Sequence, residues 1–201
     1  MKNIIIIQHA QSVQHTNGMV GSWTDWELTE LGRKQAENIG RKLSAELIGQ
    51  GYVVYSSDLM RAKQTAEPLA RYLGVDIAFR KELREHNDGE AVGKSRQWAR
   101  ENVLPVNSFY EPKWRGGESW GEFWNRVSGV YWEVMEINEK NIIVVAHAGT
   151  LFVWKSIWQG FEIKEFEGSS SLVGGVSFLK ITGNGKQIIE QLNNSSYREE
   201  A

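Results

Sequence analysis

The clearest pattern along the chain is a set of short, continuous apolar runs separated by longer amphipathic stretches. Ile4–Ile7 and Ile142–Ala146 are uninterrupted and rich in β-branched residues, and Tyr52–Tyr55 is a weaker example. Such runs are typical of strands in a parallel sheet, because helices cover both of its faces and every side chain is buried. The three runs therefore predict the centre of a sheet.

The amphipathic stretches between these runs predict helices. Thr29 is placed to cap the first helix and Gly49 to end it. Ser57 and Asp58 are placed to cap the second, which ends at Gly74. The residues on the apolar face are Ala36, Ile39, Leu43 and Leu47 in the first helix, and Leu59, Ala62, Ala66, Leu69 and Leu73 in the second.

A proline and a capping box refine this prediction. Pro68 lies inside the second helical pattern, where we expect it to kink the helix or shift its boundary. Ser119 and Glu122 have the spacing of a capping box at the start of a third helix. The apolar residues that follow this box at helical spacing are Phe123, Val127, Val130 and Val134.

Strands that alternate with helices favour an α/β fold, a three-layer α-β-α sandwich around a mainly parallel sheet. Leu172–Ile181 and Gln187–Leu192 flank a Gly183-Asn184-Gly185 turn and predict two strands that add an antiparallel edge. The polar end of the chain, Asn193–Ala201, is expected to fray.

The length of 201 residues fits one domain, residues 1–201, with a core large enough to need no covalent staple. A segment at about 85–118 contains two of the three prolines and has weak periodicity. Because long irregular segments in compact domains usually carry function, we expect this segment to form a loop or lid over a site.

Composition narrows the possible functions. The 23 basic and 25 acidic residues give a formal net charge of −2, so no basic excess favours binding to nucleic acid. The absence of cysteine excludes disulfides, thiolate metal ligands and a thiol nucleophile. The early apolar run is too short for a signal peptide or a membrane span, and a cytoplasmic location is therefore expected.

Three polar residues follow predicted strands and point to a common site. His9 comes two residues after the first strand, His147 directly after the Ile142–Ala146 strand, and Arg61 in the first turn of the helix after Tyr52–Tyr55. Ligands of open α/β sheets bind outside the carboxyl ends of the strands. Two imidazoles and a guanidinium suit phosphoryl transfer, which needs a nucleophile and donors for the equatorial oxygens.

With these residues in place, the chain resembles the histidine phosphatase superfamily, in the branch that includes phosphoglycerate mutases and small phosphatases. The matching segments, in order along the chain, are QHAQS at Gln8–Ser12, GSWTDWELTELGRKQA at Gly21–Ala36, SSDLMRAKQTA at Ser56–Ala66, LRE at Leu83–Glu85, GGES at Gly116–Ser119 and VVAHAGT at Val144–Thr150. The resemblance covers nearly the whole chain and implies a phosphoglycerate mutase-like fold.

The resemblance also implies roles for individual residues. His9 would be the nucleophile that becomes phosphorylated, with Arg61 and His147 binding the phosphoryl oxygens. Glu85 would protonate the leaving group and then activate water. Without the resemblance, Glu85 would be interpreted as a surface carboxylate, and Asp88 or Glu90 would be equally good candidates for the acid. The other residues implied to bind substrate are Gln8, Ser12, His15 and Ala148.

Three positions depart from the family pattern. Gln8 stands where the family has arginine, Ala10 where it has glycine, and His15 where asparagine is common. Glutamine keeps two N–H donors but lacks the charge of the guanidinium. Loss of one preorganised donor typically costs about 2.7–4 kcal/mol, or roughly 10²–10³ in rate. Two hypotheses follow from this loss. In the first, another cation replaces the lost charge; in the second, the site has changed to a substrate of lower charge or to binding without turnover. The candidate cations for the first hypothesis are His15, His86, Lys63, Lys94 and Arg96.

The histidines and tryptophans bear on metal binding and on the substrate pocket. None of the four histidines is paired at the spacing of a helical metal site, and the resemblance implies metal-independent chemistry without a cofactor. Five of the nine tryptophans lie between residues 98 and 132. We expect Trp98 and Trp114 to line a substrate pocket, and those on the third helix, Trp120, Trp124 and Trp132, to pack in the core.

The sequence therefore predicts a phosphomonoester hydrolase that acts on a small phosphorylated substrate through phosphohistidine. Mutase chemistry is the alternative, but family mutases carry a larger basic insertion than the few cations here: Lys94, Arg96, Arg100, Lys113 and Arg115. The acid phosphatase branch is disfavoured because Gln11-Ser12-Val13 replaces its Arg-x-Pro continuation. A non-catalytic binder, suggested by Gln8, is the third possibility. The natural substrate and the oligomeric state are left open.

Overall fold

A computed structural model of the chain describes residues 1–162 and 171–199. Within them, one mixed sheet has the strand order β3-β2-β4-β1-β5-β6. Its strands are β1 (Lys2–Gln8), β2 (Tyr52–Ser57), β3 (Ile77–Arg80), β4 (Asn141–Ala146), β5 (Val176–Ile181) and β6 (Gln187–Asn194). β1 to β4 are mutually parallel, and β5 and β6 form an antiparallel edge. The predicted sheet is confirmed.

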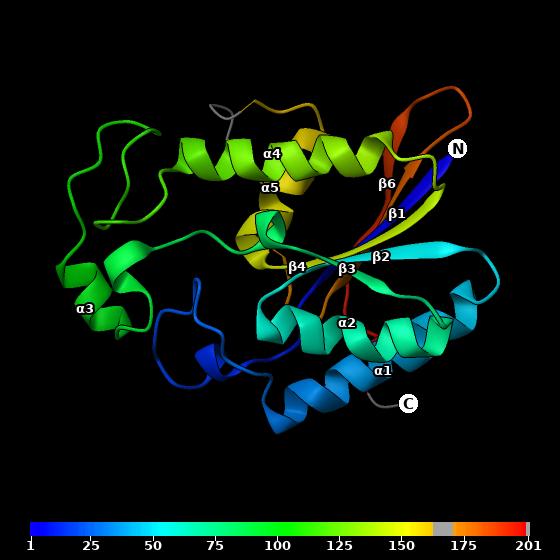
Figure 1. Cartoon of the computed structure of the whole chain (residues 1–201), viewed down its shortest axis with the longest axis horizontal. Helices are drawn as coiled ribbons and strands as arrows, with labels where there is room; N and C mark the ends of the chain where they lie inside the picture. The colour runs from blue at the N-terminus through cyan, green and yellow to red at the C-terminus, as the bar shows by residue number, and fades with distance from the viewer. Residues whose placement is uncertain (163–170, 200–201) are drawn as a thin grey trace.

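Helices cover both faces of this sheet (Figure 1). α1 (Glu30–Leu47) and α2 (Met60–Leu73) lie on one face, and α4 (Trp120–Glu136) and α5 (Ala148–Trp158) on the other. The short α3 (Arg96–Glu101) lies beyond one end of the sheet. The remaining short elements are 3-10 turns at Val13–His15, Lys81–Leu83 and Gly89–Ala91.

The sequence of β1 fits this three-layer arrangement. Ile5 and Ile7 pack into the apolar cluster beneath α1 and α2, whereas Ile4 and Ile6 pack into the cluster beneath α4 and α5. All four are at most 1% exposed. Successive side chains in a strand point to opposite faces, so a strand covered on both sides needs an unbroken apolar run.

Two of the predicted helix caps are present. The Thr29 hydroxyl accepts a hydrogen bond from Gly32 N at 3.0 Å at the start of α1. At the start of α4, Ser119 and Glu122 form the reciprocal capping box. Each side chain satisfies a backbone N–H that would otherwise lack a partner at the helix terminus.

The predicted cap of α2 is wrong, and so is the predicted boundary shift at Pro68. Leu59, not Ser57 or Asp58, occupies the N-cap position and makes no side-chain cap bond. Asp58 instead pairs with Arg84, and the Ser57 hydroxyl contacts His147. The boundary is not shifted by Pro68, because α2 runs past it to Leu73.

The C-terminal prediction also needs correction. Residues 172–175 precede β5 in a turn, so the strand begins at Val176 rather than Leu172. The segment from Asn193 to Glu199 does not fray: β6 runs to Asn194, and Tyr197 is only 8% exposed within the core. The Tyr197 hydroxyl donates to Glu46 at 2.8 Å. Residues 200 and 201 lie outside the described part of the chain.

The segment at 85–118 is irregular apart from the turn at Gly89–Ala91 and α3. Isolated bridges join Met19 to Ser95 and Pro112 to Ser119, so both ends of the segment contact the rest of the fold. Among the described residues no helix is long and apolar enough to cross a bilayer.

Candidate active site

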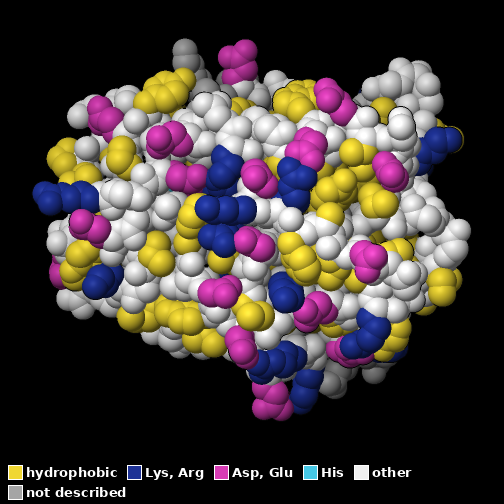
Figure 2. All heavy atoms as spheres, viewed as in Figure 1, with side chains coloured by type: hydrophobic (Ala, Val, Ile, Leu, Met, Phe, Trp, Pro, Cys, Tyr) yellow, Lys and Arg dark blue, Asp and Glu magenta, His cyan; other side chains and the backbone are white. Residues whose placement is uncertain are grey.

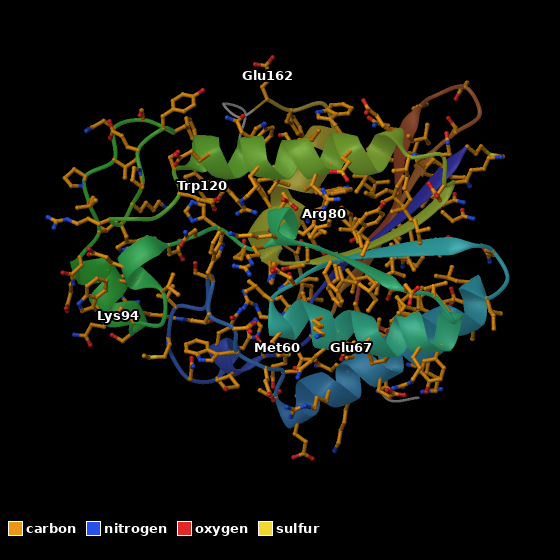
Figure 3. All side chains as sticks on the ribbon, in the orientation of Figure 1. Met60, Glu67, Arg80, Lys94, Trp120 and Glu162 are labelled. Atoms are coloured by element: carbon orange, nitrogen blue, oxygen red, sulfur yellow. The ribbon has the colours of Figure 1, made fainter. Side chains whose placement is uncertain are left out.

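The candidate site lies where the carboxyl ends of β1, β2 and β4 meet. Figure 3 labels Met60 and Trp120, which begin α2 and α4 on opposite sides of the sheet at this end. His9 follows β1, and His147 follows β4 as the N-cap residue of α5. Arg61 is the second residue of α2. Because the three strands are parallel, their ends bring these residues together.

The His9 side chain is held in one tautomer, with the unprotonated nitrogen facing Arg61. Its Nδ1 lies 2.8 Å from the Ala10 carbonyl oxygen, to which Nδ1–H donates. Arg61 Nε donates to His9 Nε2 at 3.3 Å, so Nε2 is the unprotonated atom. A neutral imidazole with Nε2 open is the form that can attack phosphorus.

Arg61 is fully buried and points its guanidinium at this nitrogen. Its Nη1 donates to Thr24 O at 2.8 Å and its Nη2 to Ser22 O at 2.7 Å. These bonds fix the plane of the guanidinium and use only part of its five donors. A phosphoryl group beside His9 would therefore meet a preoriented cation.

His147 completes the central cluster. Its ring centroid lies 5.1 Å from that of His9. Ser57 Oγ lies 2.8 Å from His147 Nε2 and also accepts from Leu59 N at 3.3 Å. His147 Nδ1 is buried and has no hydrogen-bond partner among the described residues. In the tautomer in which Ser57 donates to Nε2, Nδ1 carries the imidazole proton and is a donor available to an anion.

Glu85 reaches the same cluster from the loop after β3. Its carboxylate accepts from His86 N and from Gly149 N, each at 3.0 Å. A side chain at Gly149 would place Cβ 2.3 Å from Glu85 Oε1, so a glycine is required beside this carboxylate. The charge of Glu85 acts on Arg61, which places the two groups in one electrostatic environment.

Burial and charge set the protonation states. Burial first, and then the charge of Arg61, hold the pKa values of His9 and His147 well below the usual 6.5. Both imidazoles are therefore neutral at pH 7. Burial lowers the pKa of Arg61 to about 10, which leaves it a cation. The cluster combines one positive charge with two neutral imidazoles and suits a dianionic phosphoryl group.

The sequence reasoning gave no role to Trp23 and Arg126, which hold Glu85 in place. Trp23 Nε1 donates to Glu85 O at 2.7 Å, and Arg126 Nη2 donates to the same oxygen at 3.1 Å. Arg126 Nη1 also donates to the carbonyls of Glu82 and Arg84, while its guanidinium pairs with Glu118. The sequence signal that could have identified Trp23 is its position in the matched segment Gly21–Ala36.

The other predicted binding residues lie around the cluster. His15 is exposed, its ring centroid is 5.5 Å from that of His9, and its Nδ1 accepts from Ser12 N at 2.9 Å, which leaves the proton on Nε2. Ala148 begins α5 and brings the N-terminus of that helix to the site. Gln8 is 3% exposed, and its buried Oε1 accepts no hydrogen bond among the described residues.

The five cations considered as replacements for the lost arginine charge lie in different places. His86 pairs with Asp88, Lys63 lies over Phe79 and Lys94 over Trp98. His15 has a pKa lowered first by burial, so it is neutral at pH 7. Arg96 is closer to the site, because its charge acts on His15 and its Nη2 donates to Gln14 O.

The tryptophans predicted to line a pocket or to pack in the core lie in different environments. Trp114 lines a surface hollow at α3, and its Nε1 donates to Ala99 O at 3.0 Å. Trp98, on α3, is half-buried outside that hollow. On α4, Trp132 is 54% exposed, so the expectation that it packs in the core is wrong. No three His, Asp or Glu side chains within residues 1–162 and 171–199 form a group suited to a metal ion.

Comparison with known proteins identifies the family of the chain. The family model of the histidine phosphatase superfamily (branch 1) matches residues 4–195. A 2,3-bisphosphoglycerate-dependent phosphoglycerate mutase from Nitrobacter winogradskyi is 31% identical over 127 residues, which are 58% of this chain and 59% of the mutase. Phosphoserine phosphatase 1 from Hydrogenobacter thermophilus is 26% identical over 172 residues, which are 83% of this chain and 80% of that protein.

Solved structures show the same fold. A mycobacterial glucosyl-3-phosphoglycerate phosphatase in complex with VO3 superposes with a TM-score of 0.80 at 18% identity, covering 96% of this chain and 99% of that one. At this level of identity, the likeness concerns the arrangement of strands and helices.

Proposed function

The chain belongs to branch 1 of the histidine phosphatase superfamily, and on that premise we propose that it is a phosphomonoester hydrolase with a phosphohistidine intermediate. One observation carries the proposal. His9 Nε2 is unprotonated, faces the Arg61 guanidinium at 3.3 Å, and lies in a ring 5.1 Å from that of His147. A histidine with a purely structural role does not require an unprotonated nitrogen directed at a buried guanidinium.

In the first step, His9 Nε2 attacks the phosphorus of the monoester and forms a P–N bond. The bond from phosphorus to the ester oxygen breaks, and Glu85 gives its proton to that oxygen. The donors around the transferring group are Arg61, His147 Nδ1–H, His15 Nε2–H and the backbone N–H of Ala148 at the start of α5, with Ser12 holding His15 in its tautomer.

In the second step, the Glu85 carboxylate takes a proton from water, and the water oxygen attacks phosphorus. The P–N bond breaks, inorganic phosphate leaves, and His9 regains its lone pair. The site is nearly closed to solvent, since His9 is 2% exposed and His147 and Arg61 are fully buried. His15 is its exposed edge, and the entering phosphoryl group displaces the Arg61–His9 hydrogen bond.

In our proposal Gln8 slows this hydrolase only modestly. Its amide presents dipoles where the family pattern has a full charge, and Arg96 supplies positive potential from the side of His15 instead. The similarity to a phosphoglycerate mutase favours mutase chemistry as the second candidate. Both reactions share the phosphohistidine and differ in whether water or a second hydroxyl accepts the phosphoryl group.

The test compares the wild-type protein with the His9→Ala variant on a panel of phosphomonoesters that includes phosphoserine and 3-phosphoglycerate. Release of inorganic phosphate by the wild type, at least about 10³-fold above the variant, is expected from loss of the nucleophile. Conversion of 3-phosphoglycerate to its 2-isomer without release indicates the mutase. Equal background rates in both proteins overturn catalysis and leave a phospholigand binder.

A further inference from the structure

The segment over the site carries a group of cations without carboxylate partners. Residues 91–117 contain five basic and two acidic side chains in a chain whose net charge is −2. Elsewhere Arg33, Arg71, Arg80, Arg84 and Arg126 each form an ion pair. Among the described residues, none of the five cations of this segment does; they are Lys94, Arg96, Arg100, Lys113 and Arg115.

Three of these cations surround an apolar hollow, which we name the lid hollow. Its residues are Val20, Arg96, Ala99, Arg100, Val103, Lys113 and Trp114, and its volume is about 420 Å³. Apolar side chains form its walls, no carboxylate lines it, and Arg96, Arg100 and Lys113 provide its charge. Figure 2 shows basic side chains at the left end of the molecule, where Figure 1 places α3 and the loop that follows it.

Arg96 connects the lid hollow to the segment that carries His15, the exposed edge of the candidate site. Arg96 N donates to Gly18 O, and Arg96 Nη2 donates to Gln14 O at 3.4 Å. Gln14 precedes His15, whose ring is 5.5 Å from His9. The charge of Arg96 also reaches His15, where it lowers the pKa of the imidazole after burial and alongside Arg61. His15 itself lines a second hollow with Gln11, Lys34 and Gln35. A leaving group that extends past His15 on the side of Arg96 would reach the lid hollow instead.

We propose that the substrate is a phosphomonoester whose leaving group is an apolar, ring-sized moiety ending in a second anion, and that the lid hollow binds this group. The apolar walls with Trp114 accept the ring, and Arg100 and Lys113 bind the terminal carboxylate or phosphate. Because these cations have no carboxylate partner, they lose no ion pair on binding, and their charge is available to the ligand. This inference rests on the proposed hydrolase.

The experiment measures kcat/KM for two pairs of aryl phosphates. The esters of the first pair have one aromatic ring and those of the second have two, and in each pair one ester carries a terminal carboxylate and the other does not. Wild type is compared with Arg100→Gln and Lys113→Gln, and with Lys186→Gln as the matched control. Arg100 is exposed and makes no internal ion pair, so its replacement leaves the fold intact. Lys186 is exposed in the β5–β6 turn, at the opposite end of the sheet.

We expect the carboxylate to raise kcat/KM about tenfold or more in at least one pair, as a charge-assisted contact does. Arg100→Gln and Lys113→Gln should each remove most of this preference and leave the rates of the uncharged esters within about twofold. Lys186→Gln should keep the preference. High salt should weaken it in the wild type, because the cations are exposed.

Three outcomes overturn the inference. One is equal rates for charged and uncharged esters in the wild type. Another is a preference that survives both lid variants. The third is a preference lost in Lys34→Gln instead, since Lys34 lines a separate hollow with His15, Gln11 and Gln35. If no ester is hydrolysed in a His9-dependent way, the proposed function itself has failed, and binding of the carboxylated esters then tests the lid hollow alone.

Discussion

Trp23 joins the two halves of the candidate site. The carbonyls of its neighbours Ser22 and Thr24 hold the Arg61 guanidinium, while its own indole N–H holds Glu85. Cationic groups of Arg84 and Arg126 lie 4.9 and 5.8 Å from its ring. Ser22, with a φ of 42° that few non-glycine residues adopt, also donates to His86 O and accepts from Asp88 N. The residues that hold Arg61 and those that hold the loop of Glu85 therefore belong to one short segment.

Replacing Trp23 with phenylalanine should slow the chemical step without removing substrate binding. The variant loses one hydrogen bond to Glu85 O, while Arg126 still donates to the same oxygen. We expect kcat to fall about two- to tenfold, the rate equivalent of roughly 0.5–1.5 kcal/mol, with a smaller change in KM. Trp132→Phe on the exposed face of α4 is the matched control and should leave both constants unchanged. A change confined to KM contradicts this positioning role.

Gln8 gives a second prediction at this scale. If the lid cations replace the charge that the family arginine provides, Gln8→Arg should change kcat/KM by less than about tenfold. Thermal unfolding of the variant controls for strain, because the side chain at position 8 is only 3% exposed. A rise of about a hundredfold or more would show that nothing replaces the missing guanidinium.

The site could be predicted from sequence only as far as its residues follow strands or matched motifs. His9, Arg61 and His147 stand at strand ends and helix starts, where topology alone brings them together. Trp23 and Arg126 act on backbone carbonyls of a distant loop, and no side-chain pattern records such a contact. Their partners became apparent only from the folded geometry.

At the scale of elements, the contact between α1 and α2 depends on Gly40. A Cβ at this position would lie 2.8 Å from Leu69 N and 2.9 Å from Pro68 C, both backbone atoms of α2. Pro68 is therefore buried against a helix that has no side chain at the point of closest approach. This packing accounts for a proline inside α2 without a helix boundary there.

Gly40→Ala should destabilise the protein although alanine is the better helix former. The added methyl group forces α1 and α2 apart, and overpacking of this kind costs about 1–3 kcal/mol. Gly129→Ala is the control, because Gly129 is exposed in α4 with nothing within 4 Å of the added Cβ. It should gain roughly 0.5–1 kcal/mol. Urea unfolding measures both, and equal effects of the two substitutions contradict the close contact.

Elements with a clear periodicity were predictable, and those without it were missed. α5 has buried residues around most of its circumference, among them Thr150, Val153, Trp154 and Trp158, so it shows no polar stripe. β3 has four residues at the edge of the sheet and a mixed burial pattern. α3 has one turn and a half. Periodicity needs length and a solvent-facing side, which these elements lack.

At the scale of the whole molecule, the buried imidazoles link stability to pH. The folded pKa values of His9 and His147 lie well below 6.5, the value expected in the unfolded chain. As pH falls through 6.5, the unfolded chain takes up protons that the folded site refuses, so the free energy of unfolding decreases. The slope approaches about 1.4 kcal/mol per pH unit for each histidine.

Unfolding by urea between pH 7.5 and 5 should show this loss, with stability retained above pH 6.5. His9→Asn should reduce the slope by about a third to a half, because one of the titrating imidazoles is gone while His147 and, with its lowered pKa, His15 remain. Free energies of unfolding that do not change across this range would contradict the burial of neutral imidazoles in the site.

The most direct test of the central claim, that His9 is the nucleophile, is to trap the phosphorylated protein. A single turnover with an aryl phosphate is quenched in base, which preserves phosphohistidine, and the peptides are sequenced by mass spectrometry. We predict phosphate on the peptide that contains His9, more of it in Glu85→Gln because water is then poorly activated, and none in His9→Asn. Phosphate release by the wild type with an unmodified His9, or phosphate on any other residue, would contradict the account.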